Sequence, residues 1–80
     1  MGENIIKSIK KFEIETGEKP THINVYLGGI QRFREMLNLE KDVFEGLEVV
    51  EDNEIVMGAI SISKGKASKR TIDYMEMRML

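Results

Sequence analysis

Cysteine and tryptophan are absent from this 80-residue chain, which has a single histidine and a single proline. Without cysteine there is no disulfide and no thiolate ligand, and one histidine is too few for the usual Cys/His zinc sites. No apolar run approaches the roughly 18 residues of a membrane-spanning helix, and residues 1–7 lack the basic start and long apolar centre of a signal peptide. We therefore expect a cytoplasmic protein that does not bind membranes.

The chain also has little material for a core. Eighty residues form one domain, which buries a modest share of its surface. Hydrophobic residues make up 41% of the sequence and charged residues 32%, values typical of a soluble globular domain and not of a disordered chain. A folded domain of this size is often stabilised by a partner subunit, so self-association is one expectation.

The chain has no large excess of positive or negative charge, but acidic and basic residues are each clustered in one stretch. The net charge is −2, which gives no general attraction to nucleic acid. Every charged residue of the stretch 42–54 is acidic, whereas the stretch 64–70 carries only basic ones. Such runs are usually solvated loops, and the alternative is electrostatic complementarity between neighbouring copies. The acidic set is Asp42, Glu45, Glu48, Glu51, Asp52 and Glu54, and the basic set is Lys64, Lys66, Lys69 and Arg70.

The clearest local pattern runs from Pro20 to Leu37. Apolar residues alternate with polar ones over 21–27, which predicts a half-buried strand with Asn24 on its polar side. After Gly28-Gly29, apolar residues recur at helical spacing over 30–37, and Asn38 is placed to end that helix. A second amphipathic pattern predicts a helix over 4–16, with Asn4 as N-cap and Gly17 at the left-handed position after its end.

The second half of the chain reads as strands. A short strand over 47–50, the polar tetrapeptide 51–54 and a longer β-branched run over 55–62 predict a β-hairpin. Both sides of the run 55–62 are apolar, which favours a central strand or an intermolecular cover. Met75, Met77 and Met79 alternate with charged residues and predict a strand returning beside 55–62, with a bulge near Tyr74-Met75. A short C-terminal helix is the alternative.

These elements predict a single α+β domain over 1–80. Two helices pack on a small, mainly antiparallel sheet in the order α-β-α-β-β, followed by a C-terminal strand or short helix. Residues 64–80 are predicted to be mobile or ordered by a partner. The predicted core is Ile5, Ile9, Phe12, Ile23, Val25, Leu27, Ile30, Phe33, Leu37, Leu47, Val49, Val56, Ile60 and Ile62.

No residue set amounts to a catalytic, cofactor or metal signature. Gly28-Gly29 before a helix raises the question of anion binding, but the P-loop and GxGxxG patterns are missing. His22 with Ser61, Ser63 or Ser68 would need a third group in contact to form a triad, and no nucleophile motif supports one. The acids at 51–54 lack the EF-hand spacing for calcium. We expect no enzyme activity and no cofactor.

The basic residues Lys64, Lys66, Lys69 and Arg70 form the best candidate for nucleic-acid binding. They sit beside Gly65 and Ser68 in what reads as a loop, but no aromatic residue is interleaved to stack on bases. At most four phosphate contacts would give weak, salt-dependent binding.

One resemblance bears on function. Two segments of the chain carry it, namely 12–27 with the sequence "FEIETGEKPTHINVYL" and 44–52 with the sequence "FEGLEVVED", with a predicted helix between them. This arrangement resembles small phage and prophage proteins and part of the peripheral region of HK97-type capsid proteins. The resemblance covers half to two-thirds of the chain, which is too short to be a whole capsid subunit. It implies a phage-derived assembly or accessory protein in a bacterial cytoplasm or a virion, and it carries no catalytic residues.

The sequence thus predicts a non-enzymatic interaction or assembly protein that self-associates, or binds another phage or host protein, through its C-terminal part. The predicted contact residues are Ile60, Ile62, Met75, Met77 and Met79. Two alternatives stay open: weak nucleic-acid binding by the loop 64–70, and inhibition of a host enzyme through the acidic stretch 42–54, which would mimic a polyanion.

Overall fold

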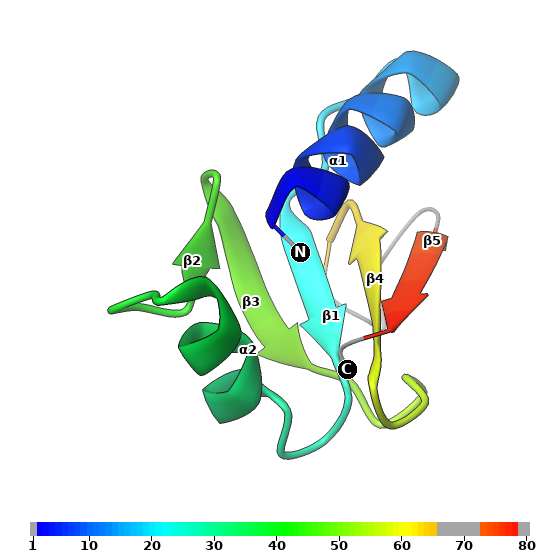
Figure 1. Ribbon diagram of the computed structural model, residues 1–80. Helices are drawn as coiled ribbons and strands as arrows, with labels where there is room; N and C mark the ends of the chain where they lie inside the picture. Colours follow the sequence, from blue (N-terminus) through cyan, green and yellow to red (C-terminus); the bar gives the residue numbers. More distant parts are fainter. Residues whose placement is uncertain (1, 66–72, 79–80) are drawn as a thin grey trace.

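The computed structural model describes residues 2–65 and the strand 73–78. Two helices lie against one face of a mixed sheet, so the α+β prediction is confirmed (Figure 1). Four strands form the body of the sheet, and a two-residue strand extends one edge. In chain order the elements are α1 (Gly2–Thr16), β1 (His22–Val25), α2 (Ile30–Leu37), β2 (Val43–Phe44), β3 (Leu47–Glu51), β4 (Ala59–Ser63) and β5 (Asp73–Arg78).

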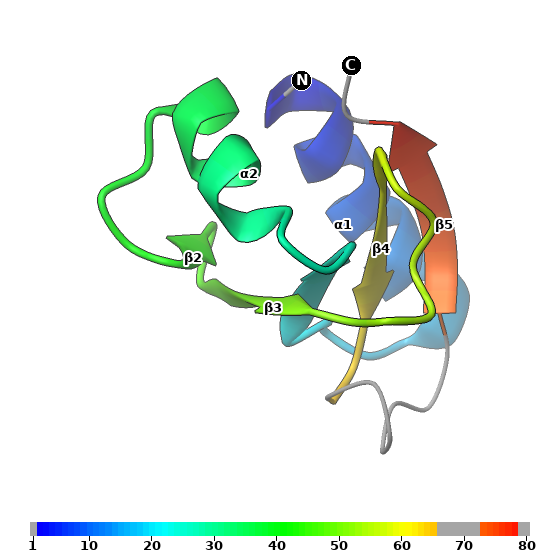
Figure 2. The same cartoon turned by 90° about the horizontal axis from the view of Figure 1, so that it is seen from below.

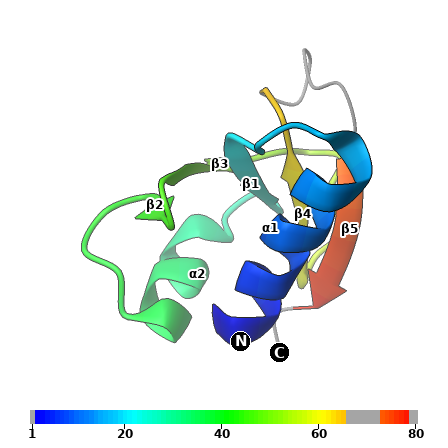
Figure 3. The same cartoon turned by 90° about the horizontal axis from the view of Figure 1, so that it is seen from above.

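The strands are ordered β2-β3-β1-β4-β5 across the sheet. β1 pairs with β3 in parallel, while the β2/β3, β1/β4 and β4/β5 pairs are antiparallel, so the sheet is mainly antiparallel as predicted. Viewed from above, α1 and α2 lie side by side on the same face (Figure 3). The arrangement leaves β1 and β4 in the middle of the sheet and makes β5 an edge strand.

Each helix ends where its local sequence requires it. Gly17 adopts φ +71° just after α1, and its N–H donates to the Glu13 carbonyl at 2.9 Å. Asn38 adopts the left-handed conformation at φ 55° after α2. The predicted N-cap Asn4 is wrong, because α1 already begins at Gly2 and the Asn4 carbonyl accepts a hydrogen bond from Ser8. Neither described helix is long and apolar enough to cross a membrane.

The predicted hairpin between 47–50 and 55–62 is wrong. β3 instead forms its hairpin with β2, through the turn residues Glu45 and Gly46, which both have positive φ. β1 separates β3 from β4, so residues 52–58 cross the end of β1 as a loop (Figure 2). The Asp52 N–H donates to the Val25 carbonyl at 2.8 Å and fixes the start of this crossing.

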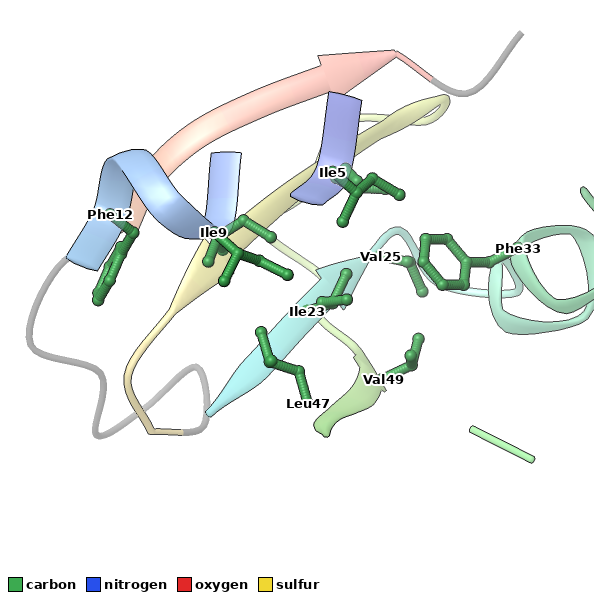
Figure 4. Packing of buried hydrophobic residues seen from close by; sticks show 10 residues of the cluster. Ile5, Ile9, Phe12, Ile23, Val25, Phe33, Leu47 and Val49 are labelled. Atoms are coloured by element: carbon green, nitrogen blue, oxygen red, sulfur yellow. The ribbon is translucent and has the colours of Figure 1, made fainter. Parts of the chain in front are cut away.

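The core lies between the helices and the sheet (Figure 4). Ten of the fourteen predicted core residues are buried, and Ile30 and Leu37 are partly buried. Leu27 and Val56 are wrong: they are 62% and 60% exposed, because both fall in loops beyond the strand ends. Burial of β4 on both faces is confirmed, with its central position as the reason. The buried residues of the prediction are Ile5, Ile9, Phe12, Ile23, Val25, Phe33, Leu47, Val49, Ile60 and Ile62.

Candidate interaction surfaces

The C-terminal strand takes the place predicted for it. β5 pairs antiparallel with β4, with Met77 opposite Ile60 and Glu76 opposite Ser61. One residue separates Ser61 from Ser63, whereas two residues of β5 separate their partners Glu76 and Asp73, so β5 contains one extra residue at Tyr74-Met75. The predicted bulge is therefore confirmed. Residues 76–78 of β5 form the regular part of the β4/β5 pairing.

The predicted contact residues divide into three groups. Ile60 and Ile62 are 0% and 1% exposed, because they point from β4 into the core beneath the helices, so the contact surface must exclude them. Met75 and Met77 belong to the edge strand β5. Met79 lies outside the described residues.

The sheet face opposite the helices carries a buried polar cluster of Asn24, Ser61 and Ser63, although the alternating pattern over 21–27 predicts Asn24 on the polar side of a half-buried strand. Asn24 is fully buried, and its amide nitrogen lies 2.8 Å from Ser63 Oγ, 3.3 Å from Ser61 Oγ and 3.4 Å from the Ser61 carbonyl. Ser61 and Ser63 are 1% and 0% exposed. Asn24 Oδ1 is buried without a hydrogen-bond partner in the part of the chain that is described. The spacing of polar residues was visible in the sequence, but the central place of β1 was not.

His22 has no serine contact among the described hydrogen bonds. Its Nδ1 lies 2.7 Å from Thr21 Oγ1, which also accepts a hydrogen bond from the Gly65 N–H at 2.7 Å. Ser63 is opposite His22 in the β1/β4 register, but its hydroxyl donates to the Gly65 carbonyl. Ser68 lies outside the described residues. His22 therefore contacts Thr21, which binds the Gly65 amide, and no carboxylate orients the His22 ring among the described hydrogen bonds.

The backbone geometry of the turn explains why residues 28 and 29 are both glycine, without an anion-binding role. Gly28 has φ +80°, and the Gly29 N–H closes a turn by donating to the Tyr26 carbonyl at 2.9 Å. A Cβ on Gly29 would lie 3.0 Å from that carbonyl oxygen and from the Tyr26 ring. The third residue of a type II turn needs a positive φ, which Gly28 supplies. Leu27 occupies the second position of this turn and is exposed.

A second turn of the same kind lies in the loop 52–58. The Ala59 N–H donates to the Val56 carbonyl at 2.9 Å, and Gly58 has φ +86° at the third position. Met57 occupies the second position and is 77% exposed. Both turns follow the carboxyl ends of the parallel strands β1 and β3, at one end of the sheet (Figure 1). We call Leu27, Val56 and Met57 the loop-end surface.

A shallow groove of about 450 Å³ follows the outer side of α2. Arg34 crosses it: its terminal Nη2 donates to the Glu40 carbonyl at 2.9 Å, and its Nε lies 3.6 Å from Asp42 Oδ1. These contacts hold the loop 39–42 against the helix and pair the Arg34 guanidinium with groups of this chain. The groove is lined by Ile30, Gln31, Arg34, Glu35, Asn38 and Leu39.

The acidic stretch does not form one surface. Asp42 is paired with Arg34, and Asp52 is 3% exposed with its Oδ1 accepting the Glu54 N–H at 2.9 Å. Glu45 and Glu51 lie at opposite ends of β3. No group of three potential metal ligands occurs among the described residues.

The basic loop is mostly outside the described residues, which end at Gly65 before the strand 73–78. Of its four predicted contact residues only Lys64 is described, and its Nζ forms an ion pair with Glu18 Oε1 at 2.8 Å. Lys66, Lys69 and Arg70 lie outside that part of the chain, so nucleic-acid binding stays a prediction.

Comparisons with protein-family models, curated protein sequences and solved structures give no match. The resemblance to phage proteins and to the peripheral region of HK97-type capsids therefore stays a prediction that rests on the residues quoted above.

Proposed function

We propose that this chain is a non-enzymatic assembly protein, phage-derived and acting in the bacterial cytoplasm or in a virion, whose copies associate through the open edge of β5. The observation that carries the proposal is the position of β5 at the end of the sheet order, where β4 is its single partner among the described strands. An edge strand presents unpaired N–H and C=O groups that another strand can bind.

The two edges of the sheet differ in a way that supports β5. The opposite edge is β2, which has two residues and follows the loop 39–42 held by Arg34. β5 has six residues and no proline, which leaves room for an added strand. The bulge at its start interrupts the ladder, so the segment 76–78 is the part suited to regular pairing.

Symmetry and charge together select one register. When two identical antiparallel strands are related by a twofold axis perpendicular to the sheet, the residue at the axis lies directly opposite the same residue of the second copy. An axis at Glu76 would set two like charges opposite each other, which is unfavourable. An axis at Met77 sets Glu76 opposite Arg78 of the second copy, and it does so twice. We therefore place the axis at Met77.

The test is the solution mass of the full chain, measured by size-exclusion chromatography with light scattering. The unmodified chain should be a dimer, and either Glu76→Lys or Arg78→Glu alone should shift it to monomer by creating like-charge pairs. An equimolar mixture of the two variants should form a mixed dimer, since each lysine or arginine then faces a glutamate. The control is Glu48→Lys, which makes the same charge change at an exposed site of β3.

A monomeric unmodified chain would refute the proposal. A dimer that is indifferent to both β5 substitutions would show that the copies associate elsewhere. Charge reversal is a cleaner test than cutting the chain after Ser63, because the cut also removes the partner strand of the buried β4.

A further inference from the structure

The groove beside α2 has the size of a binding site for a small molecule. Its volume of about 450 Å³ lies within the range of roughly 300–1,000 Å³ that is usual for such sites. The lining residues come from α2 and from the two residues that follow it, and none belongs to β5. The groove is therefore separate from the edge through which we propose that copies associate.

Part of the lining is apolar and held in place. Ile30 and Leu39 are partly buried, and both pack against the core cluster. The loop that begins at Leu39 is fixed to α2, because Arg34 Nη2 donates to the Glu40 carbonyl at 2.9 Å. This preformed apolar lining can take the hydrocarbon part of a ligand at little cost in ordering.

The other side of the groove is polar. Gln31, Glu35 and Asn38 are spaced four and three residues apart, so they follow one side of the helix. All three are exposed. Their side chains end in amide or carboxylate oxygens, which accept hydrogen bonds. A ligand with a donor group beside a hydrocarbon chain would match both sides of the groove.

The charge of the lining favours a cation as that donor. Among the described lining residues Arg34 is the one base, and its Nε lies 3.6 Å from Asp42 Oδ1, so its charge already has a counter-charge. Glu35 is the one acid of the same lining, and it forms no ion pair with any described residue. The groove also reaches Asn38 at the C-terminal end of α2, where the helix dipole is negative.

We propose that this groove binds a small aliphatic primary amine. The protonated amine donates to the Glu35 carboxylate and to the side-chain oxygen of Asn38, and its alkyl chain lies on Ile30 and Leu39. The source is a free amine and not a lysine of a partner protein. None of the exposed large hydrophobic residues of the described chain lines the groove, whereas a protein interface is usually centred on such residues.

A titration of the full chain with n-pentylamine at neutral pH, followed by amide NMR shifts, tests the site. Shifts should be confined to residues 30–39 and their neighbours and should saturate. Glu35→Gln should weaken binding about fivefold, the upper end for an exposed ion pair. Asn38→Gly should weaken it by a smaller factor, since glycine keeps the left-handed end of α2 and removes only the amide. The matched control is Glu48→Gln, which neutralises an exposed acid outside the lining and should leave the affinity unchanged.

Three further probes separate the causes of binding. 1-Pentanol has the same chain without the charge and should bind several-fold more weakly than n-pentylamine, and pentanoate should bind more weakly still. Equal binding of pentanol, or tighter binding of pentanoate, would overturn the charge argument and with it the proposal. Tighter binding of Nα-acetyl-lysine methylamide would overturn the free amine in favour of a partner's lysine. Shifts that do not saturate, or that are as large around Glu3 and Glu48, would show a general attraction of cations and no site.

The site and the proposed association at β5 are tested separately. A small amine does not change whether the chain is a monomer or a dimer, and the shifts of residues 30–39 can be followed in either form. A chain that binds n-pentylamine as a monomer would refute the association alone. A dimer without saturable binding would refute the amine site alone.

Discussion

Asn24 on β1 donates its side-chain amide to the hydroxyl of Ser63 on β4, across the centre of the sheet, at 2.8 Å. The pair is fully buried, and the other side of the Asn24 amide, Oδ1, has no partner in the described chain. A buried polar group that is only partly satisfied fixes the strand register at some cost in stability. Several outcomes can be expected from this pair and from other local contacts.

The first concerns Asn24 itself. Asn24→Ala removes the hydrogen bonds to Ser61 and Ser63 and leaves a small cavity, so it should lower the free energy of unfolding by about 1–3 kcal/mol. Asn24→Val combined with Ser61→Ala and Ser63→Ala should recover most of the loss, because the two serine hydroxyls that Asn24 contacts are removed together with it. Urea unfolding followed by circular dichroism measures both. If the triple variant had a lower free energy of unfolding than Asn24→Ala, this explanation would be wrong.

The neighbouring glycines 28 and 29 should respond differently to substitution. Gly28→Ala strains a backbone with φ +80° but meets no atom within 4 Å, so about 1–2 kcal/mol should be lost. Gly29→Ala instead brings its Cβ to 3.0 Å from the Tyr26 carbonyl oxygen and should cost about 1–3 kcal/mol by crowding.

Asparagine separates the two causes, because it tolerates positive φ but is larger than alanine. Gly28→Asn should be milder than Gly28→Ala, whereas Gly29→Asn should be no better than Gly29→Ala. Thermal unfolding curves of the four variants give the comparison, and equal responses at both positions would show that one cause acts at both.

The aromatic contact between α2 and β2 should be measurable as a coupling. The rings of Phe33 and Phe44 meet edge to face, with centroids 6.4 Å apart and planes at 88°. A double-mutant cycle with Phe33→Leu and Phe44→Leu should give a coupling energy of about 0.5–1.5 kcal/mol. Additive losses would mean that the contact between the two rings gives no specific coupling of α2 to β2.

Thr21 should protect one specific amide. Its Oγ1 accepts the Gly65 N–H at 2.7 Å, and a net hydrogen bond is worth about 1 kcal/mol, or roughly a fivefold change in an opening equilibrium. Thr21→Val should therefore speed hydrogen exchange at Gly65 by about fivefold, whereas Thr21→Ser should preserve protection. Unchanged exchange in the valine variant would show that the amide is protected by other means.

Local signals predicted local structure well. Gly17 and Asn38 end their helices as expected because left-handed residues at helix ends are a property of a few neighbouring residues. The bulge at Tyr74-Met75 was predictable because the apolar alternation changes phase there. These features do not depend on which strands become neighbours.

Strand order depends on distant pairings, and there the sequence misled. Ile55 and Val56 look like strand residues, but they belong to the loop that carries the chain past β1, with Ile55 buried as its anchor and Val56 exposed. Asn24 reads as a solvated residue of a half-buried strand, whereas it is fully buried and its amide contacts Ser61 and Ser63 of the neighbouring strand β4. The loop-end surface was missed for the same reason, since Leu27 and Val56 were assigned to the core.

The central place of β1 also has a consequence for synthesis on the ribosome. β1 is made early, but its partners are residues 48–51 and 60–63. Until those residues have emerged, Ile23 and Val25 and the apolar side of α1 have no sheet to join. The nascent chain must therefore carry exposed apolar segments until residue 63 has left the ribosome, and β1 can join its sheet only after that point.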